Sequence, residues 1–180
     1  MTNAKRRTPE EIIKSFTDEF KTKIKDIRIE KRTHGAKKTE FVTIWFTVDN
    51  SVFKRAVKHL IGLDPKFPHL AVASGNDLGK TIQLLYHFSL YHGTRNEEIS
   101  VNMLVDLPKT NPTIETLSDI IPGAVITERE KQEMLGVKVK GIPDNRRLFL
   151  PDDFPKGVYP WRKDETGPQK MVRNLHEVKP

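Results

Sequence analysis

The sequence contains no cysteine among its 180 residues. A chain without thiols can form no disulfide and can supply no thiolate ligand to an iron–sulfur cluster or a zinc ion. Any such redox centre would have to belong to another polypeptide. Because no nucleophile–base pair or set of metal ligands emerges from the sequence either, we expect no metal, cofactor or catalytic residue in this chain.

Long apolar runs are also missing. No segment approaches the ~18 consecutive apolar residues that a membrane span needs. The start, residues 1–7, lacks the apolar stretch of a secretory signal. These absences predict a soluble protein without a membrane span, and the lack of cysteine with dense charge also fits a thermophile.

Basic residues exceed acidic ones by 31 to 24, which gives a net charge of +7. A basic surface suits an acidic partner, whether nucleic acid, lipid or protein. Arg6, Arg7 and the basic segment 31–38 keep open the alternative of an RNA- or ribosome-associated α+β binding module, because aromatic residues follow that segment at Phe41, Trp45 and Phe46. A solvated surface is the favoured interpretation.

Periodicity predicts most of the secondary structure. Thr8 and Pro9 indicate a helix start, and strands are expected over 24–31 and 39–48. A helical stripe over 52–61 ends at Gly62. Strands follow at 69–74, 82–90 and 99–107, the last two from strict alternation of apolar residues. Asn111-Pro112 predicts a helix over 114–121, and a further helix carries 128–134.

This order, α-β-β-α-β-β-β-α-α, predicts an α+β domain over residues 1–136. Its sheet should be mixed and largely antiparallel, with helices packed on it. Beyond it, six of the twelve prolines fall within 137–180, so neither a helix nor a central strand is expected there. Residues 137–180 are predicted to form an extended arm. Because this arm is rich in apolar residues, we expect it to need a partner surface for its order.

Two motifs allow a chemical interpretation. Glu128, Glu130 and Glu133 could in principle perform acid–base chemistry, but a salt-bridged helix surface is the favoured interpretation because no histidine stands at ligand spacing. Gly79-Lys80-Thr81 matches the end of a phosphate-binding loop. We reject that match, because the first glycine is missing and a strand is predicted to follow.

One ordered set of motifs resembles a known family. The stretch 128–136 reads Glu-Arg-Glu-Lys-Gln-Glu-Met-Leu-Gly, the stretch 141–151 carries Pro-Asp-x-Arg-Arg and Leu-Pro, and 160–164 reads Pro-Trp-Arg-Lys-Asp. Together they resemble the 30 kDa subunit of respiratory complex I, a family shared with membrane-bound energy-converting [NiFe] hydrogenases. Ile142 and Glu133 depart from the usual pattern and favour the hydrogenase-like branch.

The resemblance implies a non-catalytic structural subunit in the peripheral arm of an ion-pumping oxidoreductase, on the cytoplasmic side of the membrane. Its implied partners are a large catalytic subunit and a small iron–sulfur subunit. Iron–sulfur clusters, and nickel–iron in a hydrogenase-type complex, would be held by those partners. No nucleic-acid partner is expected in that case. The residues predicted to dock onto the partners are Glu128, Arg129, Glu130, Glu133, Asp144, Arg146, Arg147, Phe149, Phe154, Tyr159, Trp161, Arg162, Lys163 and Asp164.

Overall fold

The computed structural model of the chain describes residues 6–35, 39–94 and 96–171. Helix α1 (Pro9–Phe20) begins as predicted, because Thr8 and Glu11 form a reciprocal capping box at its start. Helix α2 (Phe53–Leu63) follows the second strand, and helix α3 (Ala124–Leu135) precedes the arm.

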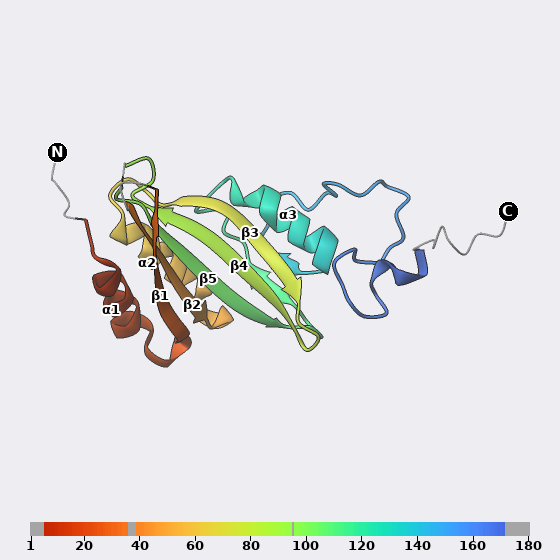
Figure 1. The fold of residues 1–180 in the computed structure, drawn as a ribbon. Helices are drawn as coiled ribbons and strands as arrows, with labels where there is room; N and C mark the ends of the chain where they lie inside the picture. The colour runs from red at the N-terminus through yellow and green to blue at the C-terminus, as the bar shows by residue number, and fades with distance from the viewer. Residues whose placement is uncertain (1–5, 36–38, 95, 172–180) are drawn as a thin grey trace.

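A five-stranded sheet forms the centre of the domain (Figure 1). Its strands are β1 (Ile24–His34), β2 (Thr39–Val48), β3 (His69–Asp77), β4 (Thr81–Leu90) and β5 (Ile99–Pro108), in the spatial order β1-β2-β5-β4-β3. All neighbours pair antiparallel except β2 and β5, which run parallel from the pair Val42 and Ile99 onward. The predicted mixed, largely antiparallel α+β fold is therefore confirmed.

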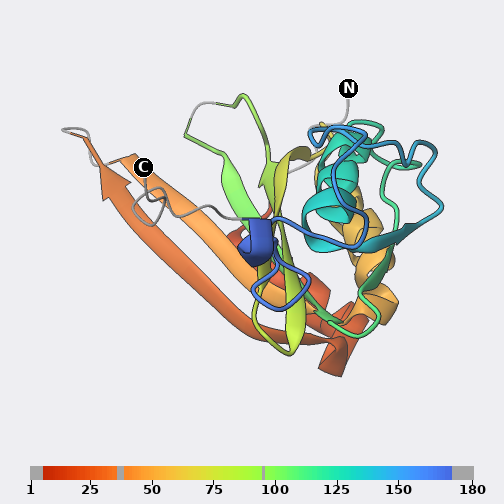
Figure 2. The same cartoon turned by 90° about the vertical axis from the view of Figure 1, so that its right-hand side faces the viewer.

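One face of the sheet carries the core. Alternate residues of β4 and β5 are buried on this face, as their period of two predicts. The apolar stripes of α1 and α2 pack in the same cluster, which also takes in Leu135 near the end of α3. Helix α3 therefore lies against β3 as part of one continuous core, and this contact places the helix beside the arm (Figures 1 and 2).

The helix predicted over 114–121 is absent, and this prediction was wrong. Residues Thr113–Glu115 form strand β6, which pairs in parallel with β7 (Lys138–Lys140). Ile114, Leu117 and Ile121 are nevertheless buried, because a tight turn in which Ile121 donates to the carbonyl of Leu117 at 2.7 Å follows the strand. Their helical spacing came from a strand followed by a turn.

Several boundaries also differ from the prediction. Strand β1 extends to His34 and α3 begins at Ala124. Helix α2 continues through Gly62 and ends at Leu63. Strand β3 extends to Asp77, through residues expected to form a tight connection, and Gly75 lets the end of α3 approach it. A Cβ at Gly75 would lie 2.5 Å from the Leu135 side chain, so this position accepts no larger residue without a shift.

The basic hairpin does not present its aromatic residues on one surface. Phe46 is 1% exposed and belongs to the core, whereas the ring of Trp45 lies under the guanidinium of Arg28 at 4.8 Å. Phe41 is exposed. The tip residues 36–38 fall outside the described residues. Figure 2 shows the β1–β2 hairpin projecting away from α3 and the arm.

The predicted arm begins inside the domain, because Lys138–Lys140 form β7 and Val137 and Val139 belong to the core. After β7 it has little regular structure, as its prolines predict. A single 3₁₀ turn, Pro168–Met171, occurs in its described part. The ribbon folds back over α3 and reaches the end of β3 (Figure 1). Among the described helices, none combines the length and the apolar character required to cross a membrane.

Candidate functional site

The site is the surface where α3, the end of β3 and the arm meet. Helix α3 ends at Gly136, which adopts a left-handed conformation with φ of 68° and donates to the carbonyl of Gln132 at 3.0 Å. The ring of Tyr159 lies against this glycine, and a Cβ there would be 2.6 Å from the ring. The glycine thus allows both the helix stop and the close approach of the arm.

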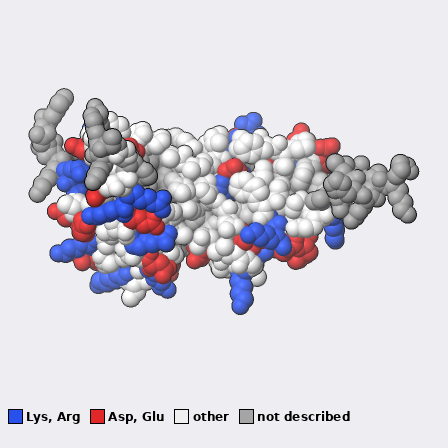
Figure 3. Space-filling view, in the orientation of Figure 1, with Lys and Arg blue, Asp and Glu red and all other residues white. Residues whose placement is uncertain are grey.

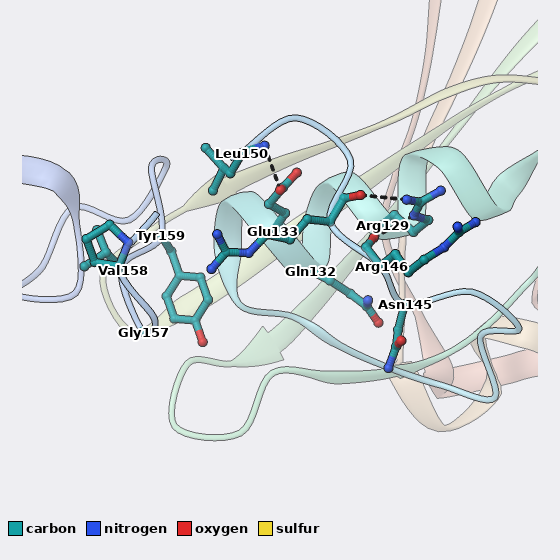
Figure 4. Close-up of a pocket in the computed structure, with 11 residues that line it drawn as sticks. Arg129, Gln132, Glu133, Asn145, Arg146, Leu150, Gly157, Val158 and Tyr159 are labelled. Atoms are coloured by element: carbon teal, nitrogen blue, oxygen red, sulfur yellow. Dashed lines mark hydrogen bonds between the residues drawn. The ribbon is translucent and has the colours of Figure 1, made fainter. Parts of the chain in front are cut away.

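Glu133 fixes the bend of the arm. Its carboxylate accepts backbone N–H groups of three consecutive residues, Leu148 at 3.3 Å, Phe149 at 2.9 Å and Leu150 at 2.8 Å (Figure 4). Hydrogen bonds to an ionised acceptor are stronger than neutral ones. The carboxylate therefore binds the backbone of the arm, whereas a salt-bridged helix surface was the favoured interpretation of the glutamates of α3.

Arg129 provides the complementary contact. Its guanidinium donates to the carbonyls of Arg146 at 2.8 Å and Arg147 at 2.7 Å, and it lies 3.3 Å from the Asp144 carboxylate. Arg146 donates to the same carboxylate through two nitrogens, at 3.0 and 2.8 Å. These hydrogen bonds from Arg146, with the charge of Arg129, hold the pKa of Asp144 well below its usual range.

The arm also closes on itself. The guanidinium of Arg147 donates to the carbonyls of Pro151 at 2.5 Å and Phe154 at 3.0 Å. Further along, Tyr159 donates its N–H to the carbonyl of Thr166 at 2.7 Å. Side chains and backbone thus supply the hydrogen bonds that regular structure would otherwise provide.

The far end of the arm is held by an ion cluster that we call the Asp77 latch, formed by Asp77, Lys109, Lys163 and Asp164. The side chain of Asp77 has no exposed surface, and it accepts from the Lys109 ammonium at 2.7 Å, the Lys163 N–H at 2.8 Å and the Gly79 N–H at 2.9 Å. The ammonium also lies 2.6 Å from Asp164. Burial alone would raise the pKa of Asp77, but these donors outweigh it and lower the pKa.

The arm caps the carboxyl end of α3. Trp161 donates its backbone N–H to the carbonyl of Met134 at 3.0 Å, and the buried guanidinium of Arg162 donates to the carbonyl of Leu135 at 2.6 Å. The last carbonyls of a helix lack partners within the helix and attract cations. Arg162 therefore meets both needs at once.

Lys131 is a buried cation at the same place. Its ammonium pairs with the Glu130 carboxylate and lies 5.1 Å from the centre of the Trp161 ring. Burial lowers the pKa of Lys131, against the opposing effect of Glu130. A cation over an indole ring is attracted by the electrons of its face, so this contact ties Trp161 to α3.

Glu128 has a different role, because it does not contact the arm. Its carboxylate is 2% exposed and accepts from the Thr116 hydroxyl and the Leu117 N–H, each at 2.6 Å. Burial raises the pKa of Glu128, although these two hydrogen bonds oppose the shift. The side chain therefore holds the β6–α3 connection in place.

Comparison with known proteins assigns the family. The family model described as "Respiratory-chain NADH dehydrogenase, 30 Kd subunit" matches residues 46–170. The chain belongs to this family. The membership predicted from the three motifs is thus confirmed.

Relatives within and around the 30 kDa subunit family carry several names. The membrane-bound hydrogenase subunit beta of Pyrococcus furiosus is 40% identical over 134 residues, which cover 73% of this chain and 75% of that protein. A subunit of the F(420)H(2) dehydrogenase of Methanosarcina mazei is 31% identical, and the match covers 91% of this chain and 96% of that protein. Formate hydrogenlyase subunit 5 of Escherichia coli is 40% identical over 100 residues, only 17% of its length.

Among solved structures, the fold is similar to a chain of the membrane-bound sulfane sulfur reductase (MBS), an archaeal respiratory membrane complex. The TM-score is 0.69 at 20% identity, and 95% of each chain is covered. A trypsin-resistant fragment of Nqo5 matches with a TM-score of 0.53 at 20% identity, covering 74% of this chain and 98% of the fragment. At this identity the similarity concerns the fold.

The structure shows which of the predicted docking residues are engaged within the chain and which expose apolar surface. Most of them make contacts within the chain, as described above. Phe149 and Trp161 expose 61% and 40% of their surface, and Phe154 and Tyr159 are half-buried. Docking onto a partner stays a prediction, but the residues with free apolar surface are now known.

Sequence reasoning missed the other half of the contacts. Nothing marked Asp77, Lys109 or Thr116 as a contact of the arm or of α3. Lys131 falls in the motif over 128–136, but only a salt-bridged helix surface was expected there. The available signal was its place in the helix: a lysine one position after Glu130 and four before Leu135 lies on the side of α3 that faces β3.

Proposed function

We propose that the chain is a non-catalytic structural subunit in the peripheral part of a membrane-bound oxidoreductase complex of the hydrogenase-like or complex I-like kind. Its α3–arm surface would dock onto a large catalytic subunit and a small iron–sulfur subunit, on the cytoplasmic side of the membrane. It would keep their redox centres in register for electron transfer. Membership of the 30 kDa family and the names of the relatives support this proposal.

The iron–sulfur clusters, and nickel–iron in a hydrogenase, would belong to the partner subunits. The sequence offers no thiolate for such a centre. The contribution of this chain would therefore be geometric. Electron transfer would depend on it only through the positions of its partners.

The observation that carries the proposal is a docking surface prepared in advance. Glu133, Arg129 and the Asp77 latch fix the backbone of the arm, while Phe149 and Trp161 keep large apolar surfaces exposed. Surfaces that are ordered before binding lose less conformational entropy in the complex. Exposed aromatic anchors on a rigid support are typical of the energetic centre of an interface.

The distribution of charge agrees with this assignment. In Figure 3, blue and red side chains crowd the end occupied by the β1–β2 hairpin, whereas much of the same face over the middle of the molecule is uncharged. Interface centres are depleted in charged residues compared with the remaining surface. The hairpin end therefore resembles solvated surface, whereas most charged residues of α3 and the arm take part in the contacts within the chain described above.

The match to formate hydrogenlyase subunit 5 gives independent support. There, a segment similar to this chain makes up 17% of a longer polypeptide. A covalent connection to further sequence of a hydrogenase subunit suits a domain that must remain attached to its partner. In separate chains, the α3–arm surface would replace that connection.

A single substitution can test the proposal without unfolding the chain. Phe149→Ser removes an exposed ring, while the backbone N–H of residue 149 still donates to Glu133, so the fold should be unaffected. We expect that the large subunit no longer copurifies with this chain from solubilised membranes. Phe67→Ser is the matched control. Phe67 is 47% exposed, and it lies just before the start of β3, whereas the Asp77 latch lies at the end of that strand.

The result that would overturn the proposal is equally direct. If the large subunit still copurifies undiminished with both Phe149→Ser and a chain that lacks residues 143–180, the arm has no docking role. The truncation keeps β7, since that strand pairs with β6.

A further inference from the structure

Two adjoining hollows lie where the arm crosses α3, and Figure 4 draws the residues that line the first of them. The first has a volume of about 190 Å³ and lies between Arg129, Glu133, the segment 145–150 and the segment 155–159. The second extends along β7, from Gly136 to Ile142. Gln132, Asn145 and Tyr159 line both hollows, so the two form one groove, which we call the α3–arm groove.

The α3–arm groove is electrically positive. The first hollow is lined by three guanidinium groups and a single carboxylate, and Lys138 is the charged residue that lines the second. The one carboxylate, Glu133, is saturated by three backbone N–H groups. Arg146 leaves 83% of its side chain exposed beside Asp144. Anionic groups should therefore be attracted to the groove.

The residues shared by the two hollows offer unused hydrogen-bond donors. The Asn145 amide and the Tyr159 hydroxyl make no hydrogen bond with any other described residue. Gln132 uses its oxygen to accept from Val139, so its NH₂ group is free of that contact. The amides of Gln132 and Asn145, flanked by cationic side chains, suit a carboxylate, whereas the Tyr159 hydroxyl lies apart from both of them in Figure 4.

The walls of the groove add an apolar component. Leu150 and Val158 line the first hollow and Ile142 lines the second. All three are half-buried. A small inorganic anion would gain nothing from these walls, whereas a peptide segment would contact them along its length.

We propose that the α3–arm groove receives an acidic side chain, aspartate or glutamate, carried on an extended segment of the large redox subunit. Its carboxylate accepts hydrogen bonds from Asn145 and the Gln132 amide, with Arg146 and Lys138 on either side. The apolar walls hold the neighbouring residues of that segment. This inference rests on the proposed function and specifies the chemistry of its interface.

The test adds one negative charge to the groove without changing its shape. Asn145→Asp is nearly isosteric and exposed, and it places a carboxylate against the incoming one. We expect the purified complex, held by a tag on this chain, to release the large subunit about 30-fold faster. The difference should shrink as salt rises, because ions screen the repulsion.

The matched control is Asn96→Asp. Asn96 is an exposed residue in the β4–β5 connection, away from the arm. Its substitution should therefore leave the release rate of the large subunit unchanged. Lys138→Gln is a second groove variant, which removes a positive charge and should accelerate release in the same direction. Thermal melting of each isolated chain checks that Asn145→Asp and Lys138→Gln are folded.

The outcomes separate this inference from the proposed function. If Asn145→Asp and Lys138→Gln release the large subunit at the rate of Asn96→Asp while Phe149→Ser still loses it, the groove holds no carboxylate and the inference is overturned. If Phe149→Ser and the chain that lacks residues 143–180 also retain the large subunit, the docking role of the whole surface fails.

Discussion

Removal of the Glu133 carboxylate should release the bend of the arm and leave the domain folded. In Glu133→Ala, the N–H groups of Leu148, Phe149 and Leu150 lose their common acceptor. The two shorter bonds are partly accessible to water, so each should contribute about 1 kcal/mol, and the longer one less. We expect the closed arm to lose about 2 kcal/mol relative to its open form.

Such a loss multiplies the population of the open arm by about 30. Hydrogen exchange of the amides at 148–150 should accelerate by that factor, because exchange follows the local opening equilibrium. Trypsin should also cleave faster after Arg147, whereas the strands of the sheet should keep their protection. Glu165→Ala is the control, since Glu165 is exposed and makes no hydrogen bond with another described residue. Unchanged exchange at 148–150 in Glu133→Ala would refute the role assigned to this carboxylate.

Two further perturbations address the helix end and the latch. Gly136→Ala combines left-handed backbone strain with a clash against Tyr159, whereas Gly79→Ala has the same strain in open space. Urea denaturation should show that the free energy of unfolding falls by about 1 kcal/mol in Gly79→Ala and by at least about 2 kcal/mol in Gly136→Ala. Equal losses in the two variants would exclude the clash. Lys109→Met leaves the carboxylate of Asp77 buried without its cation and should cost about 3 kcal/mol at pH 7. Because folding lowers the pKa of Asp77, the latch contributes fully above the ordinary aspartate pKa of about 3.9 and loses its contribution as the pH falls through the lowered pKa. The free energy of unfolding of the wild-type chain should therefore fall steeply below about pH 4, and that of Lys109→Met should fall less. If the two chains show parallel dependence of stability on pH, the Asp77 latch does not stabilise the fold in this way.

Sequence patterns were sufficient for elements whose residues interact locally. The alternation in β4 and β5 and the capping box at Thr8 depend on neighbours within a few positions, so they could be read directly. The strand β6 could not be found in this way, because its partner β7 lies 25 positions further along the chain at each paired residue, such as Ile114 and Val139. Helical spacing over 114–121 therefore gave a wrong helix.

The motif residues lie together on α3 and the arm, but their contacts differ from the prediction. Charges of opposite sign were expected to pair with each other. Instead, Glu133 and Arg129 bind the backbone of the arm. An irregular ribbon has many backbone groups without partners, and a sequence does not reveal which side chain will satisfy them. The arm was expected to gain order from a partner, yet its described part already packs on its own domain.

The parallel pairing of β2 with β5 has a consequence for how the chain folds. It joins residues 42–47 to residues 99–104 across the middle of the sheet, whereas the hairpins on either side close over short loops. Loop-closure entropy must be overcome before such a distant pairing is rewarded, so proteins of high contact order fold slowly. Neither the β1–β2 hairpin nor the β3–β4–β5 meander can bury its apolar face alone. The rate-limiting step of folding should therefore be the meeting of these two halves, and the transition state should contain the β2–β5 contact.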